Sequence, residues 1–101
     1  TVWVPLVDVT DELGPLEIVP DSHKAGPLDH VLDGIPVIKD YPDDGFVKVP
    51  MTVGDGLLFN TMTVHRSGVN RTEDRIRWAM AFRYNDAADA DFRERKFPRN
   101  R

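Results

Sequence analysis

The feature that most constrains the fold is the alternation of side chains in the stretch RIRWAMAFRY, residues 75–84. In an extended strand, successive side chains point to opposite faces of the sheet. Large apolar side chains fall on one face of this stretch, and arginines and alanines fall on the other: Ile76, Trp78, Met80, Phe82 and Tyr84 against Arg77, Ala79, Ala81 and Arg83. We expect the bulky apolar face to pack against the rest of the protein.

The opposite face of this strand places two alanines between two arginines and so leaves empty volume beside a cation. A guanidinium in such a space binds a carboxylate through a two-pronged, charge-assisted hydrogen bond. The pattern fits a cavity that holds an anion, and it also fits a solvent-facing side with scattered arginines. The residues alone leave both interpretations open.

Five further stretches have the β-branched and aromatic composition of short strands, and turn residues separate them. They are residues 2–9, 15–20, 46–51, 56–60 and 61–65. We expect the first two to form a hairpin, with a turn at TDELG in which Gly14 takes a positive φ. The segment 21–45 has proline, glycine or aspartate every few residues, which predicts a loop without a long helix or strand. Six short strands predict an all-β barrel or sandwich.

Composition places the chain among globular proteins, since 41% of its 101 residues are hydrophobic and 30% are charged. The absence of cysteine excludes disulfides and thiolate metal sites and is compatible with the cytoplasm, where we expect the protein to act. The net charge of −4 argues against a nucleic-acid surface. No apolar run is long enough to span a membrane. Residues 85–101 form a polar, basic tail that is either a solvated terminus or a patch for a partner.

Among three histidines, His65 is the one that we expect at the end of a strand, where a sheet holds a metal ligand rigidly. Ser67 returns to the same face two residues later, so a histidine, a hydroxyl and an arginine could converge on one cavity wall. A lone histidine is also commonly a hydrogen-bonded structural residue. His23 and His30 lie in turn-rich segments, where we expect structural roles.

Other chemistries have no support in the pattern of residues. The carboxylates lie mostly in turns, and Asp55 is most simply a turn residue between strands. No carboxylate pair on an apolar strand suggests a glycosidase, and the sequence has neither a phosphate-binding glycine loop nor a nucleophile elbow.

Three blocks of the sequence, in order, resemble the C-terminal half of the phytanoyl-CoA dioxygenase (hydroxylase) family of iron(II)- and 2-oxoglutarate-dependent oxygenases. They are VWVPLVDVTDELGPLEIVPDSHKAG, VPMTVGDGLLFN and HRSGVNRTEDRIRWAMAFRY. The resemblance implies a double-stranded β-helix (jelly roll), of which residues 1–84 would be the C-terminal half. It also implies hydroxylation of a small organic substrate by oxygen, with 2-oxoglutarate converted to succinate.

By the same resemblance, His65 matches the distal histidine of a two-histidine, one-carboxylate iron site. Arg77 matches the arginine that binds the distal carboxylate of 2-oxoglutarate, Ser67 a hydroxyl that helps to hold it, and Trp3 a nearby tryptophan. Arg75 competes with Arg77 for this role, because the spacing from the histidine is one residue longer than is usual. We favour Arg77 because its flanking residues align better. Asp21 stands where the family usually has glycine, and aspartate tolerates such turns.

The His-x-Asp/Glu motif that supplies the other iron ligands in the family does not occur in these residues. We therefore expect the chain to be a fragment that lacks an N-terminal half and to dimerise, swap strands or pair with the missing segment through its exposed edges. The residues 21–46 would shape the substrate entrance. The alternative is a non-catalytic jelly-roll binding or structural module that has lost its iron site.

Overall fold

A computed structural model of the chain describes residues 1–33 and 35–94. Its strands are short, as expected for a sequence divided by so many proline, glycine and aspartate residues: β1 (Val2–Pro5), β2 (Leu16–Ile18), β3 (Val31–Asp33), β4 (Ile35–Val37), β5 (Val47–Val49), β6 (Leu57–Leu58), β7 (His65–Ser67) and β8 (Ala79–Phe82). The helical segments are equally short: the 3-10 turns η1 (Asp11–Leu13) and η2 (Ser22–Ala25), and α1 (Ala90–Glu94).

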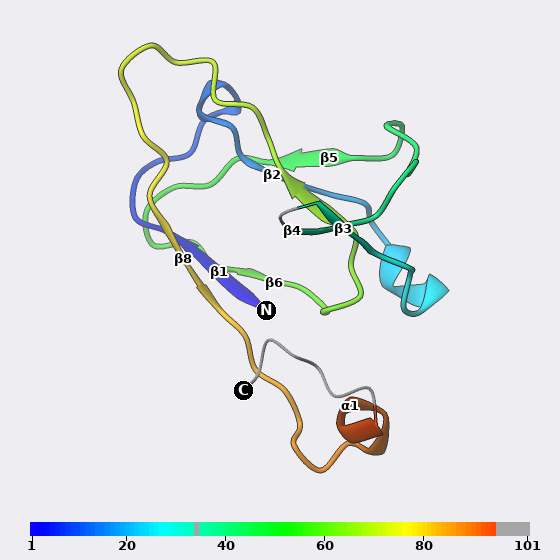
Figure 1. Ribbon diagram of the computed structural model, residues 1–101. Helices are drawn as coiled ribbons and strands as arrows, with labels where there is room; N and C mark the ends of the chain where they lie inside the picture. Colours follow the sequence, from blue (N-terminus) through cyan, green and yellow to red (C-terminus); the bar gives the residue numbers. More distant parts are fainter. Residues whose placement is uncertain (34, 95–101) are drawn as a thin grey trace.

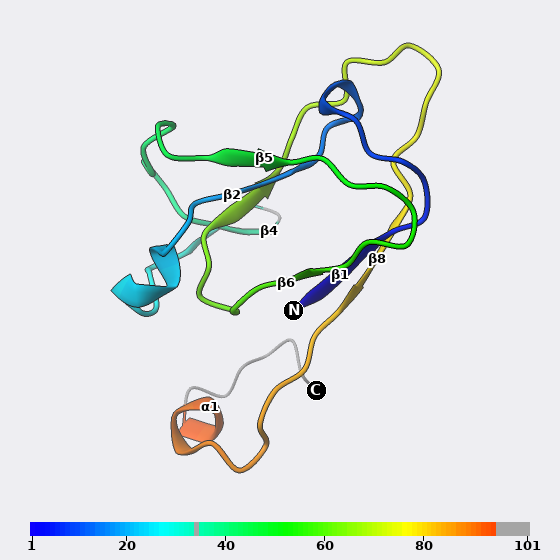
Figure 2. The ribbon, with the colours of Figure 1, turned by 180° about the vertical axis from the view of Figure 1, so that it is seen from behind.

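Six of these strands form two antiparallel three-stranded sheets, with the orders β6-β1-β8 and β5-β2-β7. The two sheets lie as layers on either side of a shared interior (Figures 1 and 2). Neighbouring strands are far apart in the sequence, so the chain passes repeatedly from one layer to the other. This all-β arrangement agrees with the jelly-roll fold expected from the sequence.

The core lies between the two sheets and takes residues from both. It consists of Trp3, Val9, Leu16 and Met51. Val9 and Met51 also form an isolated antiparallel bridge, which ties the segment after β1 to the segment after β5. Burial of these side chains is the main favourable contribution to holding the layers together.

The predicted hairpin of residues 2–9 and 15–20 is wrong. Strand β1 pairs with β6 and β8, whereas β2 pairs with β5 and β7 in the other sheet. The connection carries the chain from one layer to the other, and its η1 turn buries Leu13, which is 1% exposed. Gly14 follows with the expected positive φ, 74°. We expected TDELG to be a simple turn and did not predict that its leucine is buried. Because Leu13 is buried, this segment is part of the interior.

The segment 61–65 was predicted to be a strand that ends at His65, but the structure begins β7 at that residue. A tight turn precedes it, in which the amide of Thr63 donates to the carbonyl of Asn60 over 2.9 Å. The side-chain oxygen of Asn60 also accepts from the amide of Met62 at 2.8 Å. Asparagine commonly stabilises turns in this way, and its side chain explains the later start of the strand.

The bulky face of residues 76–84 does not pack inward, contrary to our expectation. Trp78 is 59% exposed, and the other large residues of this face are exposed as well. The register places Ala81 opposite Trp3 and Ala79 opposite Pro5, so the small residues face the interior. Ala79 is half-buried and packs against the core, whereas Ala81 shares the face of Trp3 but remains exposed.

In the described part of the segment 21–45, the elements are η2 and the two-stranded sheet β3-β4, as expected for a region without long elements. Asp21 takes the left-handed conformation that its turn requires, with φ 61°. In the tail, Arg93 lies in α1, whereas Arg95, Lys96, Arg99 and Arg101 lie outside the described residues. Within the part of the chain that the structure describes, no helix is long and apolar enough to cross a membrane.

Candidate functional site

His65 is the first residue of β7, opposite Ile18 of the central strand β2. Its Nδ1 lies 2.8 Å from the carbonyl oxygen of Thr63. A carbonyl only accepts hydrogen bonds, so in the neutral ring Nδ1 carries the hydrogen and Nε2 keeps its lone pair. This is the arrangement in which a histidine binds a metal, with the second nitrogen held by a backbone oxygen.

Arg77 reaches across from the segment before β8 to the other sheet. Its Nη2 donates to Ser67 Oγ at 2.9 Å, and its Nη1 donates to the carbonyl oxygen of Gly14. The side chain is half-buried. These two contacts use two of the five N–H groups of the guanidinium, so the cation retains donors for an anion.

Trp3 forms the floor beside this cation. The guanidinium carbon of Arg77 lies 5.6 Å from the centre of the indole, within the range of a cation–π contact. Trp3 is 7% exposed and belongs to the central strand β1. The three residues that the family resemblance assigns to a 2-oxoglutarate site are Trp3, Ser67 and Arg77. In the structure, Trp3 and Ser67 both contact the guanidinium of Arg77, although the three come from different parts of the chain.

A close backbone contact joins the turn before β2 to the turn after β7, two neighbouring strands of one sheet. A Cβ on Gly14 would lie 2.6 Å from the carbonyl oxygen of Gly68, and a Cβ on Gly68 would lie 2.7 Å from that of Pro15. The amide of Gly68 donates to the same Pro15 oxygen at 2.8 Å. Two glycines are required here because any larger residue would separate the turn after β7 from the turn before β2.

Phe59 is a site residue that we did not predict from the sequence. Its ring centre lies 4.8 Å from that of His65, and it packs against the core. The backbone oxygens of Thr63 and Gly14, which orient His65 and Arg77, were also not predicted. Phe59 lies two residues beyond Leu57, the partner of Trp3, so strand parity would have indicated it once that pairing was known.

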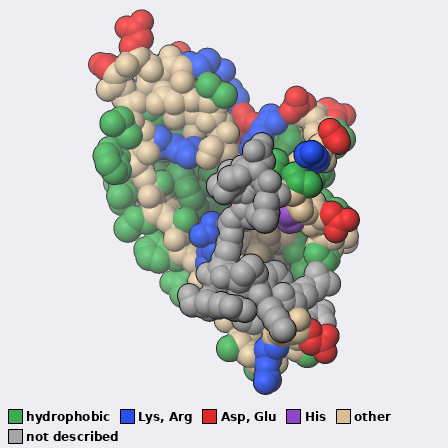
Figure 3. Space-filling model, in the orientation of Figure 1, with side chains coloured by type: hydrophobic (Ala, Val, Ile, Leu, Met, Phe, Trp, Pro, Cys, Tyr) green, Lys and Arg blue, Asp and Glu red, His purple; other side chains and the backbone are tan. Residues whose placement is uncertain are grey.

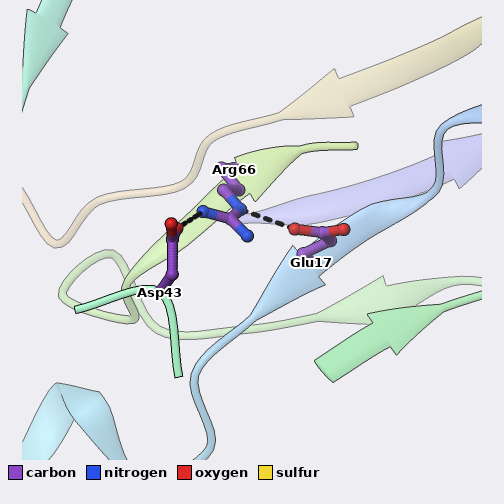
Figure 4. Close-up of polar contacts among 3 residues, drawn as sticks. All are labelled: Glu17, Asp43 and Arg66. Atoms are coloured by element: carbon purple, nitrogen blue, oxygen red, sulfur yellow. Dashed lines mark hydrogen bonds and ion pairs between the residues drawn. The ribbon is translucent and has the colours of Figure 1, made fainter. Parts of the chain in front are cut away.

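On the opposite face of β7, between His65 and Ser67, Arg66 forms a separate charged cluster (Figure 4). Its Nε lies 2.5 Å from Glu17 Oε2, and its Nη1 lies 2.5 Å from Asp43 Oδ1. Its guanidinium carbon lies 3.9 Å from the ring centre of Phe46. The hydrogen bonds to Asp43 and then to Glu17 raise the pKa of Arg66 above its ordinary value. This cluster fastens the loop before β5 to the outer side of the sheet.

The remaining candidates lie outside this site. Arg75 is exposed, and its Nη2 lies 3.3 Å from the backbone oxygen of Asp8, so the geometry brings Arg77 rather than Arg75 to Ser67. His30 is exposed, with Nδ1 2.7 Å from the carbonyl of Leu28. Asp55 accepts from the amide of Thr52 at 2.8 Å, in the turn expected of it.

Among the described residues, the family resemblance assigns the role of a metal ligand to His65 alone. His23 is exposed in η2. No group of three histidine, aspartate or glutamate side chains that could hold an ion occurs within residues 1–33 and 35–94. The donor set is therefore one oriented imidazole, beside a cation and a hydroxyl suited to a carboxylate.

Two facing antiparallel sheets of short strands place the protein in the jelly-roll class of folds. The sequence profile of the phytanoyl-CoA dioxygenase (PhyH) family matches residues 1–79. The chain belongs to this family.

Curated relatives agree with this family. A 1-deoxypentalenic acid 11-beta-hydroxylase of Streptomyces arenae is 35% identical over 85 residues, which are 73% of this chain and 30% of that protein. Phytanoyl-CoA dioxygenase domain-containing protein 1 of Danio rerio is 35% identical over 91 residues, 80% of this chain and 31% of that protein. Dioxygenase aneA of Aspergillus aculeatus is 38% identical over 72 residues, 71% of this chain and 22% of that protein.

The chain spans less than a third of the length of each of these three relatives. No solved structure matches it significantly. Together, the family and the relatives support an oxygenase of the hydroxylase or dioxygenase type.

Proposed function

We propose that this chain forms one wall of the active site of an iron(II)- and 2-oxoglutarate-dependent dioxygenase that hydroxylates a small organic substrate. His65 is the proposed metal ligand, and Arg77, Ser67 and Trp3 form the proposed co-substrate site. When bound, iron(II) and 2-oxoglutarate supply the oxidation, in which oxygen is consumed and the keto acid becomes succinate and carbon dioxide. The observation that carries this proposal is the contact of Arg77 with Ser67, on the strand that His65 begins.

Arg77 holds and orients a carboxylate in this proposal. Its guanidinium is positioned by Gly14 and Ser67 before any anion arrives. Binding therefore requires little reordering of a long side chain, which lowers the entropic cost of association. The hydroxyl of Ser67 can donate its own hydrogen to the same anion, because it accepts from Arg77 through a lone pair.

His65 sets the other end of the site. It lies two residues from Ser67 along β7, a distance of roughly 7 Å in an extended strand. A short dicarboxylate bridges such a distance, with one end near the imidazole and the other near the guanidinium. The contact of Nδ1 with Thr63 directs the free Nε2 and limits rotation of the ring. The ring of Phe59 packs against one side of the imidazole, with 4.8 Å between the ring centres.

Two further parts of the proposal concern the surroundings of this site. We propose that the segment 21–46 shapes the substrate entrance. It is anchored to the sheet at Asp43 and Phe46 by Arg66. A cytoplasmic location is proposed from the absence of cysteine.

Binding of 2-oxoglutarate, measured by calorimetry, tests the carboxylate site. We expect Arg77→Ala to weaken binding roughly ten- to a hundredfold, because a charge-assisted hydrogen-bonded pair is worth about 1.5–3 kcal/mol. Arg77→Lys keeps the charge but cannot make the two-pronged contact. Its affinity for 2-oxoglutarate should therefore lie between those of Arg77→Ala and the parent. Arg75→Ala, a nearby exposed arginine, is the matched control and should bind normally. Equal weakening by both alanine variants would contradict the assignment.

Oxygen-dependent formation of succinate, measured with the protein as its gene encodes it, tests the metal ligand. His65→Ala should abolish this activity in the presence of iron(II), and His30→Ala should retain it. Both histidines have the same contact between Nδ1 and a backbone carbonyl, so His30 is a close control. If the parent protein binds 2-oxoglutarate but forms no succinate, the non-catalytic jelly-roll module is the better description.

A further inference from the structure

Ser22 is a buried polar residue that links two distant segments of the chain. It is 9% exposed and begins η2. Its Oγ donates to the carbonyl oxygen of Val19 at 2.7 Å and accepts from the amide of Val64 at 2.8 Å. The second contact spans 42 residues of sequence and joins η2 to the segment that leads into β7 (Figures 1 and 2). The hydroxyl therefore uses both its hydrogen and a lone pair, as buried hydroxyls generally do.

The amide that donates to Ser22 belongs to the same peptide group as the carbonyl that orients His65. A peptide group is planar and joins the C=O of one residue to the N–H of the next. In the group between Thr63 and Val64, the oxygen lies 2.8 Å from Nδ1 of His65, and the N–H donates to Ser22. In a trans peptide these two bonds point in opposite directions. Ser22 and the imidazole therefore bind the two ends of one rigid plane.

The surroundings of this peptide group make the contact with Ser22 decisive for its orientation. Thr63 and Val64 are buried, with exposures of 8% and 6%. The next carbonyl along the chain, that of Val64, accepts from the amide of Val19 at 2.9 Å, so the backbone is held on that side as well. Without the hydroxyl of Ser22, the buried amide of Val64 loses its acceptor, and an unpaired buried N–H is costly. We expect the peptide group to turn toward another acceptor, which moves its carbonyl oxygen away from His65.

We propose that Ser22 is a positioning residue for His65. It holds the peptide group between Thr63 and Val64 in the orientation that keeps the hydrogen of the neutral imidazole on Nδ1 and leaves the lone pair on Nε2. Its effect on metal binding rests on the proposed function, in which His65 binds iron(II), whereas its effect on the ring does not. A hydroxyl that only stabilised the fold would change the free energy of unfolding without changing the state of the imidazole.

The nitrogen NMR spectrum of the imidazole, recorded on the metal-free protein as its gene encodes it, tests the proposal. At a pH of about 8.5, above the range in which histidines ordinarily titrate, the spectrum shows which ring nitrogen carries the hydrogen. Signals that disappear in His65→Gln identify the residue. We expect the hydrogen on Nδ1 in the parent and a mixture of both tautomers in Ser22→Ala. Ser22→Thr keeps the hydroxyl and should restore the parent spectrum. Ser22→Cys is close to serine in size but bonds weakly, so it should resemble Ser22→Ala.

Two controls separate a change at the imidazole from a general loosening of the fold. Val9→Ala removes buried methyl groups from the core, because Val9 is 2% exposed, and should lower stability while leaving the parent tautomer. Urea unfolding compares its stability with that of Ser22→Ala. Calorimetry with 2-oxoglutarate alone should give the parent affinity in Ser22→Ala, because Arg77 and Ser67 hold one another through their own hydrogen bond.

Iron(II) alone, added without oxygen, should bind about tenfold more weakly to Ser22→Ala than to the parent, the lower end of the loss from removing a direct partner of a metal-binding histidine. The parent tautomer in Ser22→Ala would overturn the proposal. An equal change of tautomer in Val9→Ala, or a parallel loss of affinity for 2-oxoglutarate, would also overturn it, because the whole fold would then have loosened. If iron(II) binds to neither protein while the tautomer still depends on Ser22, the proposed function fails and the role of Ser22 stands.

Discussion

The two sheets of this molecule turn chemically different outer sides to their surroundings. The outer side of β5-β2-β7 carries Lys48, Glu17 and Arg66 in adjacent register, and Arg66 also binds Asp43. The outer side of β6-β1-β8 instead carries apolar residues in adjacent register, which are Val2, Val4, Leu58, Met80 and Phe82. Hydrophobic side chains gather along the edge of the molecule beside β8 (Figure 3). Charged residues on a sheet surface remain hydrated and form ion pairs across strands, whereas an exposed apolar sheet surface favours association.

The outer side of one sheet therefore carries charged side chains that pair with one another, whereas the outer side of the other presents exposed apolar side chains. Both sheets nevertheless present inner faces of the same kind to a common core, with Trp3 from one layer packing near Leu16 from the other. The two sheets therefore differ only in their outer faces. Alternate residues of a strand point outward, so the chemical type of every second residue determines the character of the outer face.

The largest effect should come from Gly14→Ala, because Gly14 lies against the backbone of the turn after β7. Alanine there combines a left-handed φ of 74° with a Cβ only 2.6 Å from a backbone oxygen. We expect a loss of roughly 2–4 kcal/mol in the free energy of unfolding, measured with urea. Gly54→Ala is the control, since Gly54 also has a positive φ, 103°, but has no atom within 4 Å of the added Cβ. Equal losses would show that backbone conformation alone is responsible.

A smaller effect is expected from Arg66→Ala on the charged outer side. This change removes both ion pairs and the contact with Phe46, so Tm should fall by a few degrees, and the fall should shrink at high salt. Because the hydrogen-bonding carboxylates raise the pKa of Arg66, the arginine stays charged across the working pH range. Lys48→Ala on the same side should change Tm less. A fall that does not depend on salt would assign the effect to the aromatic contact.

The smallest effect should come from Leu58→Ser on the apolar outer side of β6-β1-β8. The free energy of unfolding should change by no more than about 0.5 kcal/mol, because the side chain is already 73% exposed. Urea unfolding provides the measurement. A loss well above this value under the same conditions would mean that Leu58 is packed within the chain, and the contrast between the two outer sides would fail.

The candidate site was more accessible to sequence reasoning than the pairing of the strands. The alternation of side chains correctly predicted that Arg77 and Trp78 lie on opposite faces of their strand. It also predicted that His65 and Ser67 lie on the same face of theirs. The resemblance to known oxygenases supplied Trp3, whose position beside Arg77 no local pattern indicates. The cluster around Arg66 was not predicted, because its partners Glu17 and Asp43 are 49 and 23 residues away in the sequence.

The sequence by itself determined the β-class of this protein, the turn at Gly14 and the relative faces of residues along each strand, because backbone preferences and a period of two are local properties. Only the tertiary structure decided which face of residues 76–84 lies inside. Periodicity separates two faces but does not say which one meets a partner, and the answer depended on Trp3 standing opposite Ala81. That pairing joins residues at opposite ends of the described chain, and it turns Arg77 toward the interior and Trp78 outward.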